Sequence, residues 1–339
     1  MKNGFEVNVK DFSGWIPIRI YRENASLMVD WGYLGSRRFT RPFFNQTVED
    51  CVRHPADTLF RHQTPLEQLG EIMSSQPAVP PAGFILHMSR CGSTLISQML
   101  AAAPENIVLS EPGPLDTILR AHFQNPEITD EQRVRWLQWL VGTWAWRRQP
   151  AEKNLFIKFD AWHTPFLPLI QRAFPGVPWI FVYREPLEVI VSQARRRGGH
   201  VIPGALEPQL FGWEPVMTAH MSLLEYGARV LAKICEAALT HLQDGNGKLV
   251  NYRQLPDSIW PALMDHWQLK FSPDAMTSMM AAARMDARNP TLSFQPDAQA
   301  KIALATPELR ALTHQWLDDV YQQLESVRMR RGFAGQLGD

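Results

Sequence analysis

The sequence predicts an α/β protein whose parallel sheet is flanked by helices, and two observations support this prediction. From residue 83 onward, short apolar segments typical of buried strands alternate with longer helical stretches, which is the pattern of a parallel sheet covered on both faces. Before it, the Pro- and Ala-rich stretch 76–82 has the composition of a linker. We therefore divide the chain into residues 1–80, a β-hairpin-containing extension of unassigned role, and residues 81–339, the α/β domain.

In the N-terminal part, apolar residues alternate over 15–21, and 26–31 can form a second strand, with 22–25 as the hairpin loop. A helix is expected to begin at Thr64, with threonine as its cap and proline at its first position.

In the second part, five strands are expected at 83–88, 107–109, 155–158, 179–183 and 248–252. Helices are expected at 93–103 and around 130–147, 165–174, 186–196 and 216–243. Sheets of this kind bind ligands beyond the carboxyl ends of their strands. The residues that follow the five strands are therefore the candidate site.

Composition narrows the choice of partners and location. The 339 residues contain 34 Lys and Arg and 34 Asp and Glu, so the formal net charge is zero. This balance provides no general attraction to nucleic acid or to an anionic membrane, and we expect neither as a partner. Three scattered cysteines, no signal-peptide pattern and no apolar run of membrane-spanning length indicate a cytoplasmic protein without a disulfide framework or zinc site. Homo-oligomerisation is left open.

The strongest local signal is the octapeptide HMSRCGST, which begins at His87 between an expected strand and an expected helix. Backbone N–H groups at a helix start lack partners and attract anions, Gly92 allows close approach, and Ser93 and Thr94 add hydroxyl donors. An ATP-type loop would carry glycine and lysine where this chain has His87 and Ser93, and the cation here is Arg90. The alternative is an ordinary turn with an incidental arginine.

This octapeptide resembles the 5′-phosphosulfate loop of sulfotransferases, commonly Pro-[Arg/Lys]-Ser-Gly-[Ser/Thr]-Thr, with Ser89 in place of proline and Cys91 in place of serine. The resemblance implies a fold related to P-loop nucleoside triphosphate hydrolases and 3′-phosphoadenosine-5′-phosphosulfate (PAPS) as donor. It also implies that the donor is held by Arg90, Cys91, Gly92, Ser93 and Thr94. A transferring sulfuryl group carries less negative charge than a phosphoryl group, so side-chain cations can suffice, and no metal is expected.

A second signal follows the fourth expected strand, where Arg184 and Ser192 are eight residues apart. This resembles the family's 3′-phosphate motif, Arg-Asp-Pro followed by serine at the same spacing, and a guanidinium fork suits a phosphate. The alternative is an arginine that caps a carbonyl and a serine on a helix surface. ATP has no 3′-phosphate, so the motif favours PAPS over ATP. Tyr252 resembles the family's tyrosine near the adenine.

The resemblance also implies catalytic roles. Glu111 lies 21 residues after Arg90, the spacing of the base in the tyrosyl-protein sulfotransferase-like branch. Lys158 ends the third strand, where family members often carry a lysine that donates to the bridging oxygen, and with Arg90 it would neutralise the leaving phosphate. Asp160 is the substitute base if Glu111 only caps the next helix. Arg288 is the stand-in for a basic residue of the family's C-terminal loop.

These motifs predict a sulfotransferase that moves a sulfuryl group from PAPS to a hydroxyl or amine of a small-molecule or peptide acceptor. Two alternatives stay open: a P-loop kinase of a small metabolite, and a non-catalytic relative that binds a nucleotide. The four tryptophans at 136, 139, 144 and 146 could line an acceptor pocket, although their helical spacing is typical of core.

Overall fold

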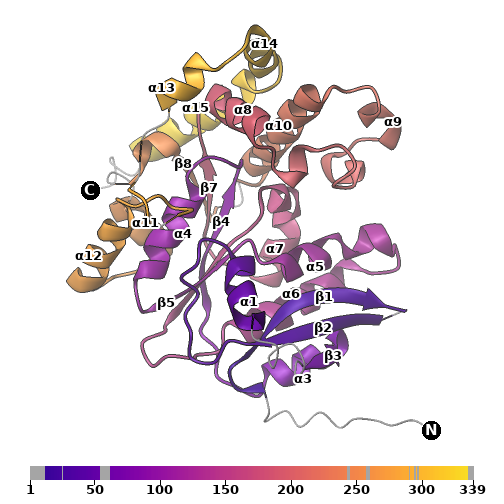
Figure 1. Cartoon of the computed structure of the whole chain (residues 1–339), viewed down its shortest axis with the longest axis vertical. Helices are drawn as coiled ribbons and strands as arrows, with labels where there is room; N and C mark the ends of the chain where they lie inside the picture. Colours follow the sequence, from indigo (N-terminus) through magenta and orange to yellow (C-terminus); the bar gives the residue numbers. More distant parts are fainter. Residues whose placement is uncertain are drawn as a thin grey trace.

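The centre of the fold is a five-stranded sheet in which all neighbouring strands are parallel (Figure 1). The computed structural model describes residues 12–24, 26–53, 62–242, 245–256, 260–289, 291–293, 295 and 298–334. The strands are β4 (Pro81–His87), β5 (Asn106–Ser110), β6 (Asn154–Lys158), β7 (Trp179–Tyr183) and β8 (Gly247–Asn251). The predicted fold class and all five predicted strands are confirmed, with ends shifted by at most two residues.

The strand order β5-β6-β4-β7-β8 places β4 at the centre and opens a crevice at its carboxyl end. The connection from β4 through α4 (Ser93–Ala102) passes over β6 to reach β5. The connection from β6 through α7 (Leu167–Ala173) passes over β4 in the opposite direction to reach β7. Such a reversal of direction leaves space for a ligand between the diverging loops.

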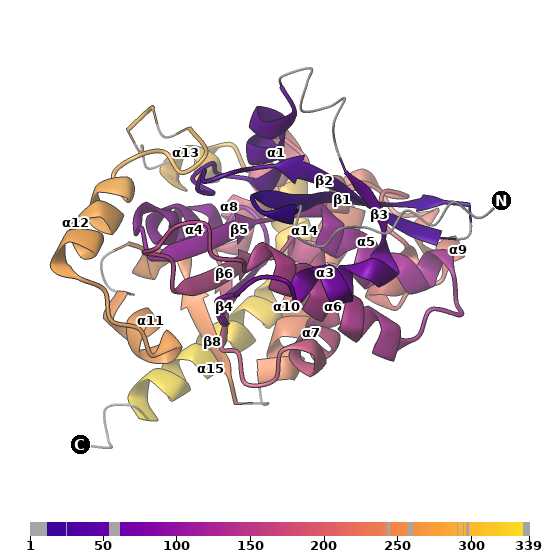
Figure 2. The same ribbon diagram turned by 90° about the horizontal axis from the view of Figure 1, so that it is seen from below.

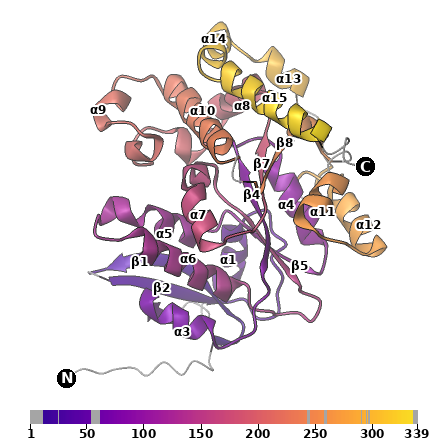
Figure 3. The ribbon, with the colours of Figure 1, turned by 180° about the vertical axis from the view of Figure 1, so that it is seen from behind.

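Helices cover both sides of this sheet (Figures 1 and 3). One side carries α4, α11 (Trp260–Trp267) and α12 (Pro273–Ala282), and the other carries α5 (Gly113–Gln124), α6 (Asp130–Trp144), α7 and α10 (Leu223–His241). Further helices in this part of the chain are α8 (Pro186–Arg195), α9 (Pro215–Thr218), α13 (Ala298–Ala303), α14 (Pro307–Trp316) and α15 (Asp318–Ala334). Short 3-10 turns are η3 (Ala161–Phe166), η4 (Gly199–Val201), η5 (Pro208–Phe211) and η7 (Tyr252–Gln254).

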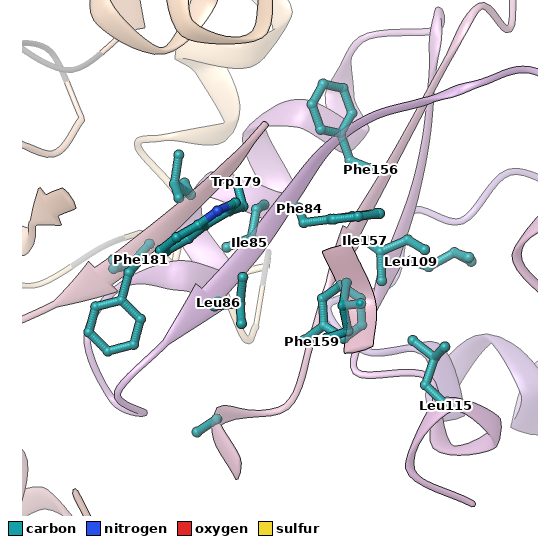
Figure 4. Close-up of a cluster of buried hydrophobic side chains, with 14 of the residues drawn as sticks. Phe84, Ile85, Leu86, Leu109, Leu115, Phe156, Ile157, Phe159, Trp179 and Phe181 are labelled. Carbon is teal, nitrogen blue, oxygen red and sulfur yellow. The ribbon is translucent and has the colours of Figure 1, made fainter. Parts of the chain in front are cut away.

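The core forms because the central strands are apolar on both faces (Figure 4). On one face the Phe84 ring lies 5.3 Å from that of Phe159. On the other face Phe156 lies 5.0 Å from Trp267 of α11. Gly83 permits that second contact, since an added Cβ would lie only 2.4 Å from the Trp267 indole nitrogen. Both faces of the sheet are therefore covered, which leaves the carboxyl ends of its strands as the place for a ligand.

The N-terminal region forms a separate three-stranded antiparallel sheet of β1 (Trp15–Glu23), β2 (Ser26–Tyr33) and β3 (Gln63–Pro65). The predicted hairpin is confirmed: Glu23 pairs with Ser26, and Asn24 adopts a left-handed φ of 54°. Of the expected loop, residue 25 lies outside the described residues.

The predicted helix start at Thr64 is wrong. Residues 63–65 pair with β2 as a strand, and the chain becomes helical only in η2 (Leu66–Gln68) and α3 (Leu69–Met73). The Thr64 hydroxyl accepts a hydrogen bond from the Trp31 indole at 3.0 Å, so it satisfies a neighbouring strand instead of a helix end.

The N-terminal sheet packs on α5 and α6 (Figure 2). The Trp144 indole donates to the Pro17 carbonyl at 2.8 Å, and Trp146 stacks on Trp31 with ring centroids 6.4 Å apart. Trp136 is also buried. The core interpretation of these tryptophans is confirmed. Helix α1 (Phe44–Val52) packs beside β2, and its first turn lies close to the end of the central sheet.

Candidate functional site

A cavity of about 520 Å³ lies beyond the carboxyl ends of the parallel strands. Each strand supplies a side chain to its lining from the loop that follows it, in the order Arg90, Glu111, Asp160, Arg184 and Tyr252. The cavity is also lined by the remaining residues predicted to bind the donor, namely Cys91, Gly92, Ser93, Thr94 and Ser192, and by Arg288. The fold thus brings together segments as far apart in the sequence as Arg90 and Arg288.

The loop after β4 makes a tight turn beside the cavity, with three residues in the left-handed region. Ser89, Arg90 and Gly92 have left-handed φ angles of 78°, 52° and 90°, and Gly92 directly precedes α4. Backbone concavities of this kind bind anions, and each non-glycine residue in such a conformation costs about 1–3 kcal/mol. Glycine is required at 92 for a second reason, because an added Cβ would lie 2.7 Å from the Tyr252 ring.

Contacts from β7 and α8 hold this loop in place. The Cys91 thiol lies 3.0 Å from the Val182 carbonyl, and the Gln193 amide donates to the Ser89 hydroxyl at 3.0 Å. The Arg90 guanidinium donates to the Arg196 carbonyl at 2.6 Å. Burial raises the pKa of Cys91 to about 11, so this side chain is a neutral thiol at neutral pH.

The cavity concentrates positive charge in a chain whose net charge is zero. Its basic lining residues are Arg90, Arg184, Arg196, Arg197, Arg288 and Lys301, and its acidic ones are Glu111, Asp160 and Asp286. Burial, and then the nearby Arg288 and Arg196, lower the pKa of Arg90 to about 10, which still leaves it charged at neutral pH. These neighbours concentrate positive potential around Arg90, which favours a strongly anionic ligand there.

Glu111 and Lys158 form an ion pair at the rim of this loop. The Lys158 Nζ lies 2.8 Å from Glu111 Oε1 and donates to Thr94 Oγ1 at 3.2 Å, so it connects the carboxylate to the phosphate loop. Lys158 is fully buried and sits beneath the cavity surface, whereas Glu111 reaches it. His87 Nε2 lies 3.4 Å from the same carboxylate oxygen. Glu111 is therefore paired with Lys158. The start of α5, after Pro112, has no side-chain hydrogen bond that caps it.

The two candidate bases have opposite electrostatics. Burial alone would raise the pKa of Glu111, but the Lys158 ammonium and the nearby His87 imidazole outweigh it, and the pKa lies well below its usual value. Burial, followed by the Glu111 and Asp116 carboxylates, raises the pKa of Asp160 well above its usual value. Glu111 is thus the carboxylate that is ionised at neutral pH, and Asp160 has a strong tendency to hold a proton.

The Arg184 side chain is buried and fixed from two sides. Its guanidinium donates to the Glu188 carboxylate through Nε, at 2.7 Å, and through Nη2. It also lies over the Tyr252 ring, with Cζ 4.0 Å from the ring centroid. Since the same ring packs on Gly92, Tyr252 connects the Arg184 site to the phosphate loop.

Sequence reasoning missed several lining residues that come from remote or irregular segments. Phe43, from the N-terminal region, places its ring 4.9 Å from the Lys158 ammonium. His200 is buried and stacks on Trp162 with ring centroids 5.4 Å apart, and burial lowers its pKa to about 3. Arg197 belongs to the arginine run 195–197, which the sequence indicates is either a solvated charged face or support for the anion, and it is exposed and also lines the cavity. No local pattern marks Phe43 or His200, because tertiary packing alone brings them here.

A metal-binding cluster and a membrane-spanning helix are both absent from the part of the chain that the structure describes. No group of three or more His, Cys, Asp and Glu side chains in it is arranged to hold a metal ion. No helix within it has the length and apolar character needed to cross a membrane.

Comparison with known proteins gave structural matches only. No protein-family model and no curated protein matches the sequence. The sulfotransferase domain of a Synechococcus olefin synthase has 18% identity and a TM-score of 0.44, over 75% of this chain and 96% of that domain. A Mycobacterium avium sulfotransferase has 13% identity and a TM-score of 0.44, over 74% and 79% of the two chains. A mouse sulfotransferase complexed with PAP has 11% identity and a TM-score of 0.41, over 80% and 94%.

Proposed function

We propose that this protein is a sulfotransferase that uses PAPS as its donor. One observation carries the proposal: the loop with Arg90 and the separate Arg184–Ser192 pair line the same cavity. One doubly phosphorylated nucleoside can therefore contact both. A cavity of about 520 Å³ lies within the ~300–1,000 Å³ range of small-molecule sites.

The residues present fit such a donor. The backbone and hydroxyl groups of 92–94 and the Arg90 guanidinium would hold the 5′-phosphosulfate, and Arg184 with Ser192 would hold the 3′-phosphate. Tyr252 lies between these two groups and offers a ring face to the adenosine. When bound, PAPS supplies an activated sulfuryl group.

The Lys158 ammonium links donor binding to the activation of Glu111. An anion in the loop competes with Glu111 for this ammonium, which already contacts Thr94. As Lys158 turns toward the anion, the pKa of Glu111 rises and the carboxylate becomes a stronger base. Glu111 then takes the proton of an acceptor hydroxyl or amine as the acceptor bonds to sulfur. Lys158 and Arg90 balance the charge on the departing 5′-phosphate.

The discriminating experiment compares the melting temperatures of the full-length chain with 3′,5′-ADP, ADP and ATP, each with and without Mg²⁺. A ligand that binds only the native state raises the melting temperature by mass action. We expect 3′,5′-ADP to give the largest increase, and we expect Mg²⁺ to leave it unchanged. A larger increase with ATP that requires Mg²⁺ would favour a kinase and contradict the proposal.

A nucleotide-binding relative without activity would also give the 3′,5′-ADP shift. Release of 3′,5′-ADP from PAPS in the presence of an acceptor separates it from an enzyme. The Glu111–Lys158 pair at the loop favours an enzyme, since binding alone does not need a carboxylate beside an anion site.

A further inference from the structure

A second cavity, of about 500 Å³, lies between the N-terminal sheet, α1 and α5. Its walls are largely apolar: Ile18 and Ile20 come from β1, Val48 and Val52 from α1, and Pro114 from α5. The volume is again typical of a small-molecule site. Most of the cavity wall belongs to the N-terminal region, for which the sequence suggested no role.

Two chain segments run from one cavity directly into the other. Phe43 lines the donor cavity, and Asn45 lines the second. In the same way Glu111 lines the donor cavity, and Gly113 lines the second. Two residues of chain span at most ~7 Å, so the second cavity begins within that distance of the proposed base.

The charged groups at the second cavity compensate one another. Arg19 is exposed and lies 3.9 Å from the buried Asp30 carboxylate, which also accepts a hydrogen bond from Gln63 at 2.7 Å. This cavity therefore combines apolar walls with a locally balanced pair, whereas the donor cavity is rich in unbalanced arginine. A neutral apolar group fits it better than an ionic one.

We propose that the second cavity holds the apolar body of the acceptor, a neutral small molecule whose hydroxyl reaches Glu111. This inference rests on the proposed function and adds the substrate class. In the productive arrangement the acceptor would pass between Phe43 and Glu111, with its hydroxyl on the donor side and its apolar part against Ile20, Val48 and Pro114.

The probe is a series of straight-chain primary alcohols, from 1-butanol to 1-octanol, added to the full-length chain with and without 3′,5′-ADP. Burial of one methylene contributes about 0.8 kcal/mol, so each added carbon should tighten binding about three- to fourfold. The readout is the concentration of alcohol that gives half of the maximal shift in melting temperature. This readout needs neither turnover nor a known natural acceptor.

Val48→Trp should fill the cavity and abolish the chain-length dependence while the shift caused by 3′,5′-ADP is retained. Gly113→Leu is the second variant. No atom lies within 4 Å of a Cβ added at Gly113, so the leucine side chain can enter the cavity without a clash at its Cβ. Val216→Trp is the matched control, because Val216 is 67% exposed on α9 and lines neither cavity.

The outcomes separate the two proposals. The inference is supported if affinity for the alcohols rises with chain length in the wild type and in Val216→Trp, and this rise is lost in a folded cavity variant. Equal affinity of the wild type for butanol and octanol, or dependence that survives in every folded cavity variant, overturns it and leaves a peptide or polar acceptor. Failure of 3′,5′-ADP to bind the wild type would instead overturn the proposed function, whatever the alcohols do.

Discussion

The two ends of the donor cavity differ in how their charges are arranged. At one end, the Arg184 guanidinium is already paired with Glu188 and stacked on Tyr252. At the other, Arg90 faces the like charges of Arg196 and Arg288. The Arg184 end is locked and nearly neutral, which suits an anchor for a ligand. The loop end keeps unbalanced positive charge, which can stabilise negative charge that develops on a reacting group of the ligand.

The loop end has an ion pair whose lysine also contacts a second partner. Lys158 has two partners there, Glu111 and Thr94, at 2.8 and 3.2 Å. Under the proposed function, we expect turnover to depend on the β5–β6 side of the cavity and donor affinity to depend on the β7–β8 side. Substitutions at the two ends should separate these effects.

The largest effect is expected from Glu111→Gln, which keeps the shape of the side chain and removes its basicity. Loss of a general base should lower turnover by ~10²–10⁴-fold, while 3′,5′-ADP binds at least as tightly as in the wild type, because the competing carboxylate charge is gone. Turnover is measured as release of 3′,5′-ADP from PAPS with 1-octanol as acceptor. Asp160→Asn is the comparison variant, and full activity in Glu111→Gln with loss in Asp160→Asn would move the base to Asp160.

The next effect is expected from Gly92→Ala. The new side chain must adopt a φ of 90° and meets the Tyr252 ring, and such strain costs about 1–3 kcal/mol. We expect a lower free energy of unfolding in urea and weaker 3′,5′-ADP binding. Gly113→Ala is the matched control, since its Cβ meets nothing within 4 Å. Equal stability of the two variants would show that the loop is not held as described.

The smallest effect is a change in how stability depends on pH. In the wild type the pKa of Glu111 is lowered on folding, so the stabilisation is present above its ordinary value of 4.5 and is lost as pH falls. In Lys158→Met, burial is the dominant effect on Glu111 and raises its pKa in the folded state. The stabilisation from Glu111 is then present at low pH and is lost as pH rises. Urea unfolding at pH 4 and pH 7 measures how the free energy of unfolding changes with pH in each protein. Identical slopes in wild type, Lys158→Met and the control Lys153→Met would contradict the role of this ion pair.

The strands and the two anion motifs could be predicted because their signals are local. The strands are continuous apolar runs, Arg184 directly follows β7, and Gly92 ends the short loop between β4 and α4. The Glu111–Lys158 contact follows from sheet pairing, in which Ser110 lies beside Lys158. That register depends on a strand order that the sequence alone does not specify.

Other features could not be predicted because their cause is tertiary. Thr64 has the sequence pattern of a helix cap, but the free edge of β2 and the Trp31 indole recruit it into a strand. Phe43 reaches the site only because the N-terminal sheet packs on α5 and α6. Nothing in the residues around Phe43 indicates that packing.

The central claim is that one molecule contacts both ends of the cavity, and calorimetric titration of two ligands tests it most directly. The ligands are 3′,5′-ADP and 5′-AMP, and the proteins are the wild type and Arg184→Gln combined with Glu188→Gln, which leaves no buried carboxylate unpaired. Loss of a charged hydrogen bond costs about 1.5–3 kcal/mol, so 3′,5′-ADP should bind about 10–100-fold more weakly to the variant. Affinity for 5′-AMP should change less than about twofold, within a few tenths of a kcal/mol. Equal weakening of both ligands would show that Arg184 does not contact the 3′-phosphate.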